Sequence, residues 1–75
     1  MNQLHKRLQS MPLTEREKEI VLLLAQGHPN KEIANRCNIT EHTVKDHLKY
    51  VYQKTGIHQR TALLARLMGV DGQQA

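Results

Sequence analysis

Residues 31–55, KEIANRCNITEHTVKDHLKYVYQKT, contain two predicted helices with a very short turn between them. The first helix is short, Lys31–Arg36, and the second covers about Glu41–Thr55. Helices joined by a turn of about three or four residues cross steeply, so few residue types fit at the crossing. Ala34 is small there, and Asn38 tolerates a left-handed backbone better than most residues that carry a side chain. This spacing is typical of a helix-turn-helix, although an ordinary helical hairpin would show the same turn chemistry.

The residues that flank these two helices indicate where they begin and end. Asn30 is predicted to be the N-cap of the short helix and Thr40 the N-cap of the longer one, because short polar side chains accept hydrogen bonds from the first turn. Gly56 follows the longer helix at the position where a left-handed residue usually ends it. A further helix is expected over about Arg60–Met68, ending at Gly69.

On the N-terminal side, TERE at residues 14–17 matches a capping box, with Thr14 as N-cap and Glu17 reaching back to it. The helix it opens has an apolar face at helical spacing and stops at Gly27. That face contains Ile20, Leu23 and Leu24. Leu22 points away from it, so we expect this side chain to be at least partly exposed.

These elements predict one all-α domain over residues 13–69. It has four helices, of which the third is the recognition helix of a helix-turn-helix and the fourth is C-terminal. Residues 1–12 are polar with weak periodicity and are interpreted as a linker or N-terminal arm, and residues 70–75 as a C-terminal tail. A linker fits an excised domain, whereas Met1 fits a natural start, and the sequence leaves both open.

Composition and charge narrow the class of protein. With 75 residues and 8.7 kDa the chain holds one small domain, and its single cysteine, Cys37, can neither close a disulfide nor build a zinc fold. The net charge is +4, and residues 28–60 carry six basic and three acidic side chains, which suggests a polyanionic partner. The longest apolar run, Ile20–Ala25, is far shorter than the roughly 20 residues of a membrane span. No segment resembles a signal peptide, so we expect a cytoplasmic protein with no membrane partner.

The third predicted helix has two distinct faces. At about 100° per residue, one side gathers apolar residues, and the other carries polar and charged ones. The apolar side contains Val44, Leu48, Val51 and Thr55, with His47 at its edge, and the polar side contains His42, Lys45, Asp46, Lys49 and Gln53. In a helix-turn-helix the polar side enters the major groove, whereas on an unrelated helix it would simply be solvated.

Short motifs then resemble one known family. They are Leu13-Thr14-x-Arg16-Glu17, Gly27-x-x-Asn30-Lys31-Glu32-Ile33-Ala34, Ile39-Thr40-x-x-Thr43-Val44-Lys45-x-His47, Lys54-x-Gly56 and Arg60. In this order and spacing, from Leu13 to about Met68, the chain resembles the LuxR/FixJ-type (GerE-type) helix-turn-helix family. Region 4 of sigma factors shares two of the motifs, but it usually has Ser-Arg where this chain has Asp46-His47. Region 4 also lacks the connection that runs here from Gly56 to Arg60 into a fourth helix.

The resemblance implies the effector domain of a bacterial transcriptional regulator or response regulator. Such a domain binds specific double-stranded DNA as a homodimer, with its recognition helix in the major groove, and uses no cofactor. A receiver or other regulatory domain would be absent from these residues. The base contacts that the resemblance implies are Lys45, Asp46, Lys49 and His42. The phosphate contacts that it implies are Asn30, Lys31, Thr40, Thr43, Tyr50 and Gln53.

Elementary chemistry agrees with these roles. Lysine donors suit guanine O6 and N7 or phosphate oxygens, and the free N–H groups at the start of the third helix suit a phosphate. Asp46 stands where the family more often has an apolar residue. It could accept a hydrogen bond from cytosine N4, or pair with Lys49 and orient it toward a guanine. Cys37, Leu48 and Thr55 also depart from the common pattern, and these three bear on packing.

The fourth helix is expected to contribute to both the core and a dimer. Leu63, Leu64 and Leu67 should face the core. Thr61, Ala65 and Met68 then form an outward stripe with small residues, where a partner helix could approach closely. Because the family commonly pairs through this helix, the stripe is the predicted dimer interface.

Catalytic and metal-binding chemistry finds little support. His42 and His47 are five residues apart, so they cannot share a metal ion as an i,i+4 pair does. Cys37 lies on an apolar stripe and is expected to be buried and unreactive, and His47 is expected to hydrogen-bond at the core edge. The sequence therefore predicts neither an enzyme nor a metal site. The alternative to a DNA-binding domain is a helical protein-interaction module that has kept the fold but lost DNA binding.

Overall fold

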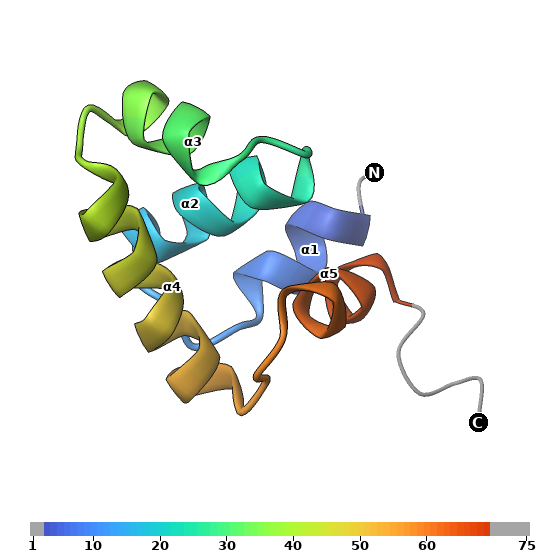
Figure 1. The fold of residues 1–75 in the computed structure, drawn as a ribbon. Coiled ribbons are helices and arrows are strands. Elements are labelled where there is room, and N and C mark those ends of the chain that lie inside the picture. The colour runs from blue at the N-terminus through green and yellow to red at the C-terminus, as the bar shows by residue number, and fades with distance from the viewer. Residues whose placement is uncertain (1–2, 70–75) are drawn as a thin grey trace.

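The structure, a computed structural model, describes residues 3–69, and for Gln3 it describes the backbone alone. Within this range the chain forms five α-helices. In chain order they are α1 (Gln3–Gln9), α2 (Glu15–Ala25), α3 (Asn30–Cys37), α4 (Glu41–Thr55) and α5 (Arg60–Met68) (Figure 1). The all-α class is confirmed, with one helix more than predicted. The predicted tail, residues 70–75, lies outside the described residues.

The predicted ends of α2, α4 and α5 agree closely with the structure. At α2 the Thr14 hydroxyl accepts a hydrogen bond from Glu17 N–H at 3.1 Å, and the Glu17 carboxylate accepts one from Thr14 N–H at 2.9 Å. The capping box is therefore confirmed. At α4 the Thr40 hydroxyl accepts a hydrogen bond from Thr43 N–H at 3.1 Å, which confirms Thr40 as the N-cap.

The prediction for the start of α3 is wrong by one residue. Asn30 is the first residue of the helix, and Pro29 is its N-cap, with φ −75°, ψ 164° and no side-chain cap bond. The first helical hydrogen bond runs from Ile33 N–H to Pro29 C=O at 3.0 Å. The proline ring already restricts φ to the value found here, so Pro29 starts the helix through its backbone geometry. Asn30 therefore makes no cap bond.

The helix α1 is absent from the prediction, which interprets residues 1–12 as a linker or arm. Leu8 in α1 is only 2% exposed, and Leu4 packs against the same core. These two residues are spaced i,i+4, which places them on one side of a helix. A helix of seven residues is too short to be stable alone, so α1 depends on α2 and α5, which both contact it.

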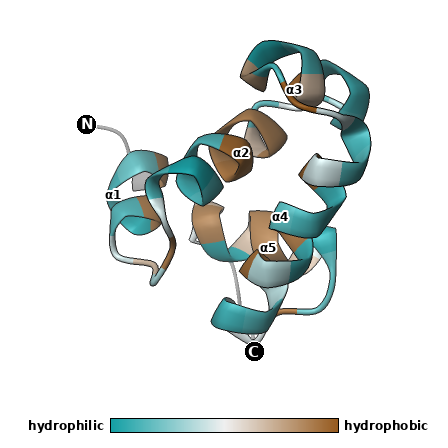
Figure 2. Ribbon diagram, turned by 90° about the vertical axis from the view of Figure 1, so that its left-hand side faces the viewer, coloured by the Kyte–Doolittle hydropathy of each residue, from teal (hydrophilic) through white to brown (hydrophobic). Residues whose placement is uncertain are grey.

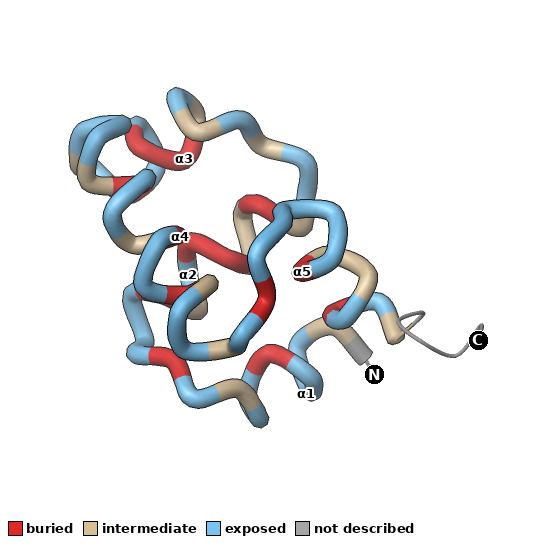
Figure 3. The backbone as a smooth tube through the Cα atoms, turned by 60° about the horizontal axis from the view of Figure 1, so that its bottom comes forward, coloured by how far each residue is buried: buried red, intermediate tan, exposed pale blue. Residues whose placement is uncertain are grey.

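The helices are arranged around α2, which contacts α1, α3 and α4. α3 and α4 form one side of the molecule, and α1 packs against α5 on the other (Figure 1). Apolar residues concentrate in α2 and α5, while α3 and α4 are mostly polar (Figure 2). Figure 3 shows the buried segments, whose apolar residues are Leu8, Leu13, Ile20, Val21, Leu24, Ile33, Ala34, Cys37, Val44, Leu48, Val51, Ile57, Leu63 and Leu67. One small core thus joins both sides and leaves the polar surfaces of α3 and α4 accessible.

The turn between α3 and α4 has the chemistry predicted for a helix-turn-helix. Asn38 has φ 59° and ψ 45°, and within residues 3–69 it is the one residue other than glycine with a positive φ. Its N–H reaches Asn35 C=O at 3.3 Å, and the N–H of Ile39 reaches Ala34 C=O at 3.0 Å. Ala34 and Val44 are buried. The left-handed residue closes α3, and the small Ala34 belongs to the core that the two helices share.

A partly buried ion pair fixes the far end of α4. Lys54 Nζ donates to Glu17 Oε1 at 2.7 Å, and the Glu17 side chain is only 6% exposed. Burial raises the pKa of Glu17, but hydrogen bonds from Lys54 and Thr14 and the charge of Lys54 outweigh burial and hold the pKa below its ordinary value. The carboxylate therefore stays charged at neutral pH and ties the last turn of α4 to the first turn of α2.

Candidate nucleic-acid interface

The helix α4 packs one side against the core and leaves the other side in solvent, as predicted. Val44, Leu48 and Val51 are buried, and Thr55 and His47 are half-buried. The exposed side consists of His42, Lys45, Asp46, Lys49, Tyr50 and Gln53. This exposed side carries the four predicted base contacts, so the structure brings them onto one surface.

Lys45 and Lys49 are the strongest candidates for contact with bases. Both are exposed and lie i,i+4 on the same side of α4. Within residues 3–69 neither ammonium group has an ion-pair partner. Their donors are therefore free for guanine O6 and N7 or for phosphate oxygens.

Asp46 pairs with a different residue from the one expected. Its Oδ2 lies 3.6 Å from His42 Nε2, and the described chain shows no ion pair between Asp46 and Lys49. Side chains on a helix lean toward its N-terminus, so a short aspartate reaches back to position i−4 more readily than forward to i+3. The expected pairing of Asp46 with Lys49 is therefore not found in the described chain, where His42 is the neighbour of this carboxylate.

The start of α4 offers a mixed environment to a phosphate. Thr40 Oγ1 accepts from Thr43 N–H, and the two hydroxyl oxygens of Thr40 and Thr43 lie 3.0 Å apart. Within the described chain the N–H groups of Glu41 and His42 have no partner, so they point to an anion at this end. The exposed carboxylate of Glu41 opposes that attraction.

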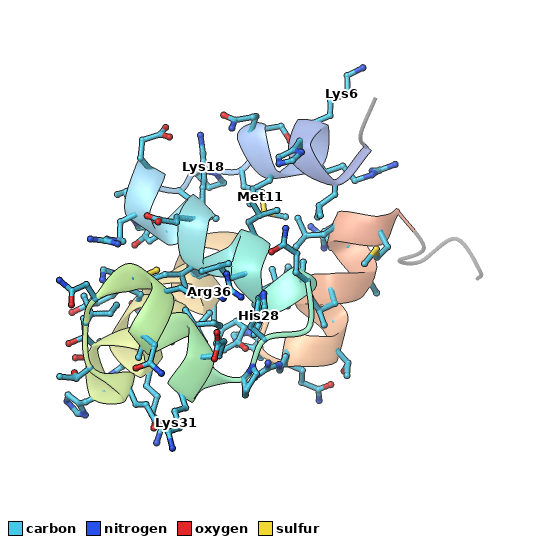
Figure 4. All side chains as sticks on the ribbon, turned by 90° about the horizontal axis from the view of Figure 1, so that it is seen from above. Lys6, Met11, Lys18, His28, Lys31 and Arg36 are labelled. Carbon is cyan, nitrogen blue, oxygen red and sulfur yellow. The ribbon has the colours of Figure 1, made fainter. Side chains whose placement is uncertain are left out.

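The two predicted phosphate contacts at the start of α3 differ in exposure. Lys31 is exposed and points away from the body of the domain, at the edge opposite Lys6 (Figure 4). Asn30 is half-buried, and its Oδ1 is fully buried without a hydrogen-bond partner. A buried amide oxygen without a partner has a free-energy cost. An amide oxygen only accepts hydrogen bonds, so the part of Asn30 that suits a phosphate is its NH2 group.

One hollow beside α4 gathers residues from three helices and from the connection before α5. Its volume is about 430 Å³, and its lining residues are Asn30, Lys45, Leu48, Lys49, Tyr52, Gln53, His58 and Arg60. It unites two predicted base contacts with two predicted phosphate contacts, Asn30 and Gln53. The other predicted contacts, His42, Asp46, Lys31, Thr40, Thr43 and Tyr50, do not line it. No carboxylate lines the hollow, so its side chains favour an anion.

Sequence reasoning missed Arg60 and His58 as parts of this site. Arg60 donates to the His28 C=O at 3.4 Å, which ties the first residue of α5 to the connection between α2 and α3. The first turn of α5 has no acidic residue, and Gln59 makes no side-chain cap bond. An arginine at the positive end of a helix dipole is unfavourable unless an anion lies nearby. This placement is the signal by which the sequence could have revealed Arg60.

The outer stripe of α5 is accessible, as its spacing predicts. Leu63 and Leu67 are buried, and Leu64 is half-buried against the core. Thr61 is exposed, Ala65 is half-buried, and Met68 is 53% exposed. Leu22 on α2 is also half-buried, which confirms the expected partial exposure.

The remaining candidates for chemistry have structural positions. Cys37 is buried in the core, as predicted. His47 is half-buried at the core edge, but it makes no hydrogen bond within residues 3–69, so the expected bond is not found. Across the described residues no three His, Cys, Asp or Glu side chains are placed to hold a metal ion. None of the described helices has the length and apolar character to cross a bilayer.

Known proteins resemble most of this chain. The profile described as bacterial regulatory proteins, luxR family, matches residues 11–67. A segment of 48 residues is 52% identical to the nitrate/nitrite response regulator protein NarL of Escherichia coli strain K12, and it covers 64% of this chain and 22% of NarL.

A second relative is the response regulator protein VraR of Staphylococcus aureus strain Mu3. It is 49% identical over 49 residues, which cover 65% of this chain and 23% of VraR. The matched segment thus spans less than a quarter of either curated relative. No solved structure matches the chain.

Proposed function

Because the chain belongs to the LuxR family of bacterial regulatory proteins over residues 11–67, we propose that it binds specific double-stranded DNA sequences and thereby regulates transcription. The observation that carries this proposal is the exposed side of α4, with Lys45 and Lys49 free of ion pairs. An α-helix fits the major groove of B-DNA, where each base pair presents a distinct pattern of donors and acceptors. The turn at Asn38 and the ion pair between Glu17 and Lys54 support the two ends of this helix.

In the proposed complex, contacts divide into those that read bases and those that bind the backbone. Lys45 and Lys49 donate to guanine edges, and Asp46, with His42 beside it, lies over the bases as an acceptor for cytosine N4. Backbone phosphates are bound by Asn30, Lys31, Thr40, Thr43, Tyr50 and Gln53. Backbone contacts position the protein, and base contacts select the sequence.

We further propose that two copies pair on DNA through the Thr61, Ala65 and Met68 stripe of α5. The stripe is accessible and contains two small residues, so two helices can approach closely. Its small area predicts a monomer in solution at micromolar concentration and a dimer on two half-sites. Ala65→Glu should then abolish cooperative occupancy of the half-sites and leave the fold intact, whereas unchanged cooperativity would place the interface elsewhere.

The relatives suggest the setting in which this domain works. NarL and VraR are named as response regulators, and the matched segment is a minor part of each. We propose that this chain is the effector domain of a cytoplasmic regulator at the nucleoid, and that a receiver or other regulatory domain controls it. It has no catalytic role in this proposal.

The direct test is selection of bound sequences from a random duplex pool, followed by affinity measurements over a range of salt concentrations. A DNA-binding domain should enrich paired half-sites, and its affinity should fall steeply between low and physiological salt as counterions are released. Failure to enrich any sequence, with weak and salt-insensitive binding, would instead support the protein-interaction module.

Substitutions separate base reading from backbone binding. Lys45→Ala and Lys49→Ala should each weaken specific binding by about 1–3 kcal/mol and change the enriched sequence. Lys31→Ala should weaken binding to all sequences equally. It should also reduce the slope of log affinity against log salt concentration (the salt slope) by about one. Equal, sequence-independent losses for all three variants would contradict the placement of α4 in the groove.

A further inference from the structure

The hollow beside α4 contains more basic side chains than the proposed base contacts require. Lys45 and Lys49 form one wall, and Arg60 and His58 belong to the start of α5 and the connection before it. No carboxylate lines the hollow, and Leu48 and Tyr52 give it an apolar part. A phosphate bound to a deoxyribose has the same combination of a charged and an apolar portion.

The start of α5 also has donors that the protein leaves unused. α2 and α4 begin at threonine side-chain caps, but Gln59 makes no cap bond at α5. The first helical bond there runs from Leu63 N–H to Gln59 C=O at 3.0 Å, which leaves the N–H groups of residues 60–62 without a partner in the described chain. Uncapped N–H groups at the positive end of a helix dipole favour a phosphate.

The guanidinium of Arg60 is partly held in place before any ligand binds. One of its nitrogens donates to the His28 C=O at 3.4 Å, and the guanidinium has five N–H donors in total. The remaining donors can bind phosphate oxygens in a bidentate arrangement. An arginine that is fixed by one backbone contact and faces an acid-free hollow is positioned to bind, not only to support the fold.

From these observations we propose that the hollow between α4 and the start of α5 binds one phosphodiester of the DNA backbone, through Arg60, His58 and the free N–H groups of α5. This inference rests on the proposed function and extends the DNA-binding surface beyond α3 and α4. Since α5 also carries the proposed dimer stripe, the phosphate orients the dimer helix relative to the groove that α4 occupies.

The test uses the duplex enriched from the random pool, with neutral methylphosphonates replacing single phosphates in both half-sites. For the wild-type chain, one position near the guanines contacted by Lys45 or Lys49 should weaken binding about tenfold. Arg60→Ala should also weaken binding about tenfold, reduce the salt slope by about one, and keep the same enriched sequence. When the duplex carries the methylphosphonate at that position, Arg60→Ala should bind it as tightly as the wild-type chain does.

Three further variants separate binding from structural and net-charge effects. Lys6→Ala removes the same charge from α1, no residue of which lines the hollow, and should change affinity less than twofold at physiological salt, because screening limits charges outside the contact. Arg60→Lys should keep part of the affinity, and His58→Gln should lose less than Arg60→Ala. Circular dichroism and thermal unfolding of each variant check that the fold is kept.

The results that overturn the inference are distinct from those that overturn the proposed function. If every methylphosphonate position weakens Arg60→Ala as much as wild type, or if Arg60→Ala behaves like Lys6→Ala, the phosphate is not bound here. If NMR shows that inorganic phosphate binds saturably at this hollow and that the duplex does not displace it, the hollow binds a free anion and not DNA. If the wild-type chain binds no duplex at all, the proposed function itself is wrong.

Discussion

The α3–α4 pair and the α1–α5 pair are held together in different ways. Between α3 and α4, a left-handed Asn38 and the Thr40 cap lie within the connecting residues themselves. α1 and α5 lie at opposite ends of the described chain and pack side by side (Figure 1). There the Arg7 guanidinium lies so close to Gly69 that a Cβ on residue 69 would be 2.7 Å from it. The comparison shows that the α3–α4 pair, which carries the proposed DNA-binding surface, is specified by local chemistry, whereas the opposite pair depends on long-range contacts.

The largest expected effect comes from removing the anchor of α1. Leu8→Ala should lower the free energy of unfolding by about 2–5 kcal/mol, because it empties a core position that is 2% exposed. Chemical denaturation would measure the loss, and Lys6→Ala on the exposed side of the same helix should stay within about 0.5 kcal/mol of wild type. If Leu8→Ala were as mild as Lys6→Ala, residues 1–12 would function as the linker that their sequence suggests.

The next effect concerns the ion pair that joins α4 to α2. Glu17→Gln should lower the free energy of unfolding at neutral pH by about 1.5–3 kcal/mol, the typical worth of hydrogen bonds to a charged group. Because the pKa of Glu17 is below its ordinary value of 4.5 in the folded chain, its contribution is present above pH 4.5 and is lost as pH falls through the folded pKa. The difference between wild type and Glu17→Gln should therefore shrink only in acid. Glu15→Gln, at a side chain 91% exposed on the same turn, is the matched control and should show little effect at any pH.

A smaller effect tests the local specification of the α3–α4 turn. Asn38→Ala should cost about 1–2 kcal/mol, since alanine gains nothing from the left-handed conformation at φ 59° and clashes there. Asn38→Gly should keep stability at or above the wild-type level, because glycine adopts this conformation without strain. Thermal unfolding of the two variants would distinguish them. Equal stability would mean that the helix crossing, and not residue 38, determines the turn.

The smallest effect concerns Asp46, where the neighbour of the carboxylate differs from expectation. Asp46→Ala should raise affinity for a scrambled duplex by less than about 1 kcal/mol, because an exposed carboxylate near phosphates is only weakly repelled at physiological salt. Affinity for the enriched duplex should fall, so that the gap between the two duplexes narrows. Both affinities are measured at one salt concentration. If binding to the scrambled duplex stays the same or weakens, Asp46 does not act by excluding wrong sequences.

The sequence predicted most of the fold because its helix ends carry chemistry that acts over a few residues. The capping box at Thr14, the Thr40 cap and the glycine after α4 all work within one helical turn, and their positions agree with the structure. Asn30 is the exception: the neighbouring Pro29 occupies the cap position through its backbone, and the Asn30 side chain makes no cap bond.

The candidate site was predictable on α4 and unpredictable around it. Helical periodicity alone placed Lys45, Asp46 and Lys49 on one exposed side, since residues one turn apart share a face. Periodicity could not place His58 and Arg60 beside them, because those residues follow α4 along the chain and reach it only through the path of the connection into α5. His42 is a different case: it lies one helical turn before Asp46, and the N-terminal lean of helical side chains, which the sequence analysis did not apply, favours it over Lys49 as the neighbour.

Patterns that act within a turn or a short connection were therefore readable in the amino acids: helix boundaries, the left-handed residue between α3 and α4, the basic face and the family resemblance. The folded arrangement alone established that α1 is a helix, that Glu17 and Lys54 pair, and that Arg60 closes a hollow against α4. The physical reason is the range of the forces involved. Caps and turns depend on hydrogen bonds between near neighbours, whereas burial of Leu8 and the grouping of cations depend on which distant segments exclude water together.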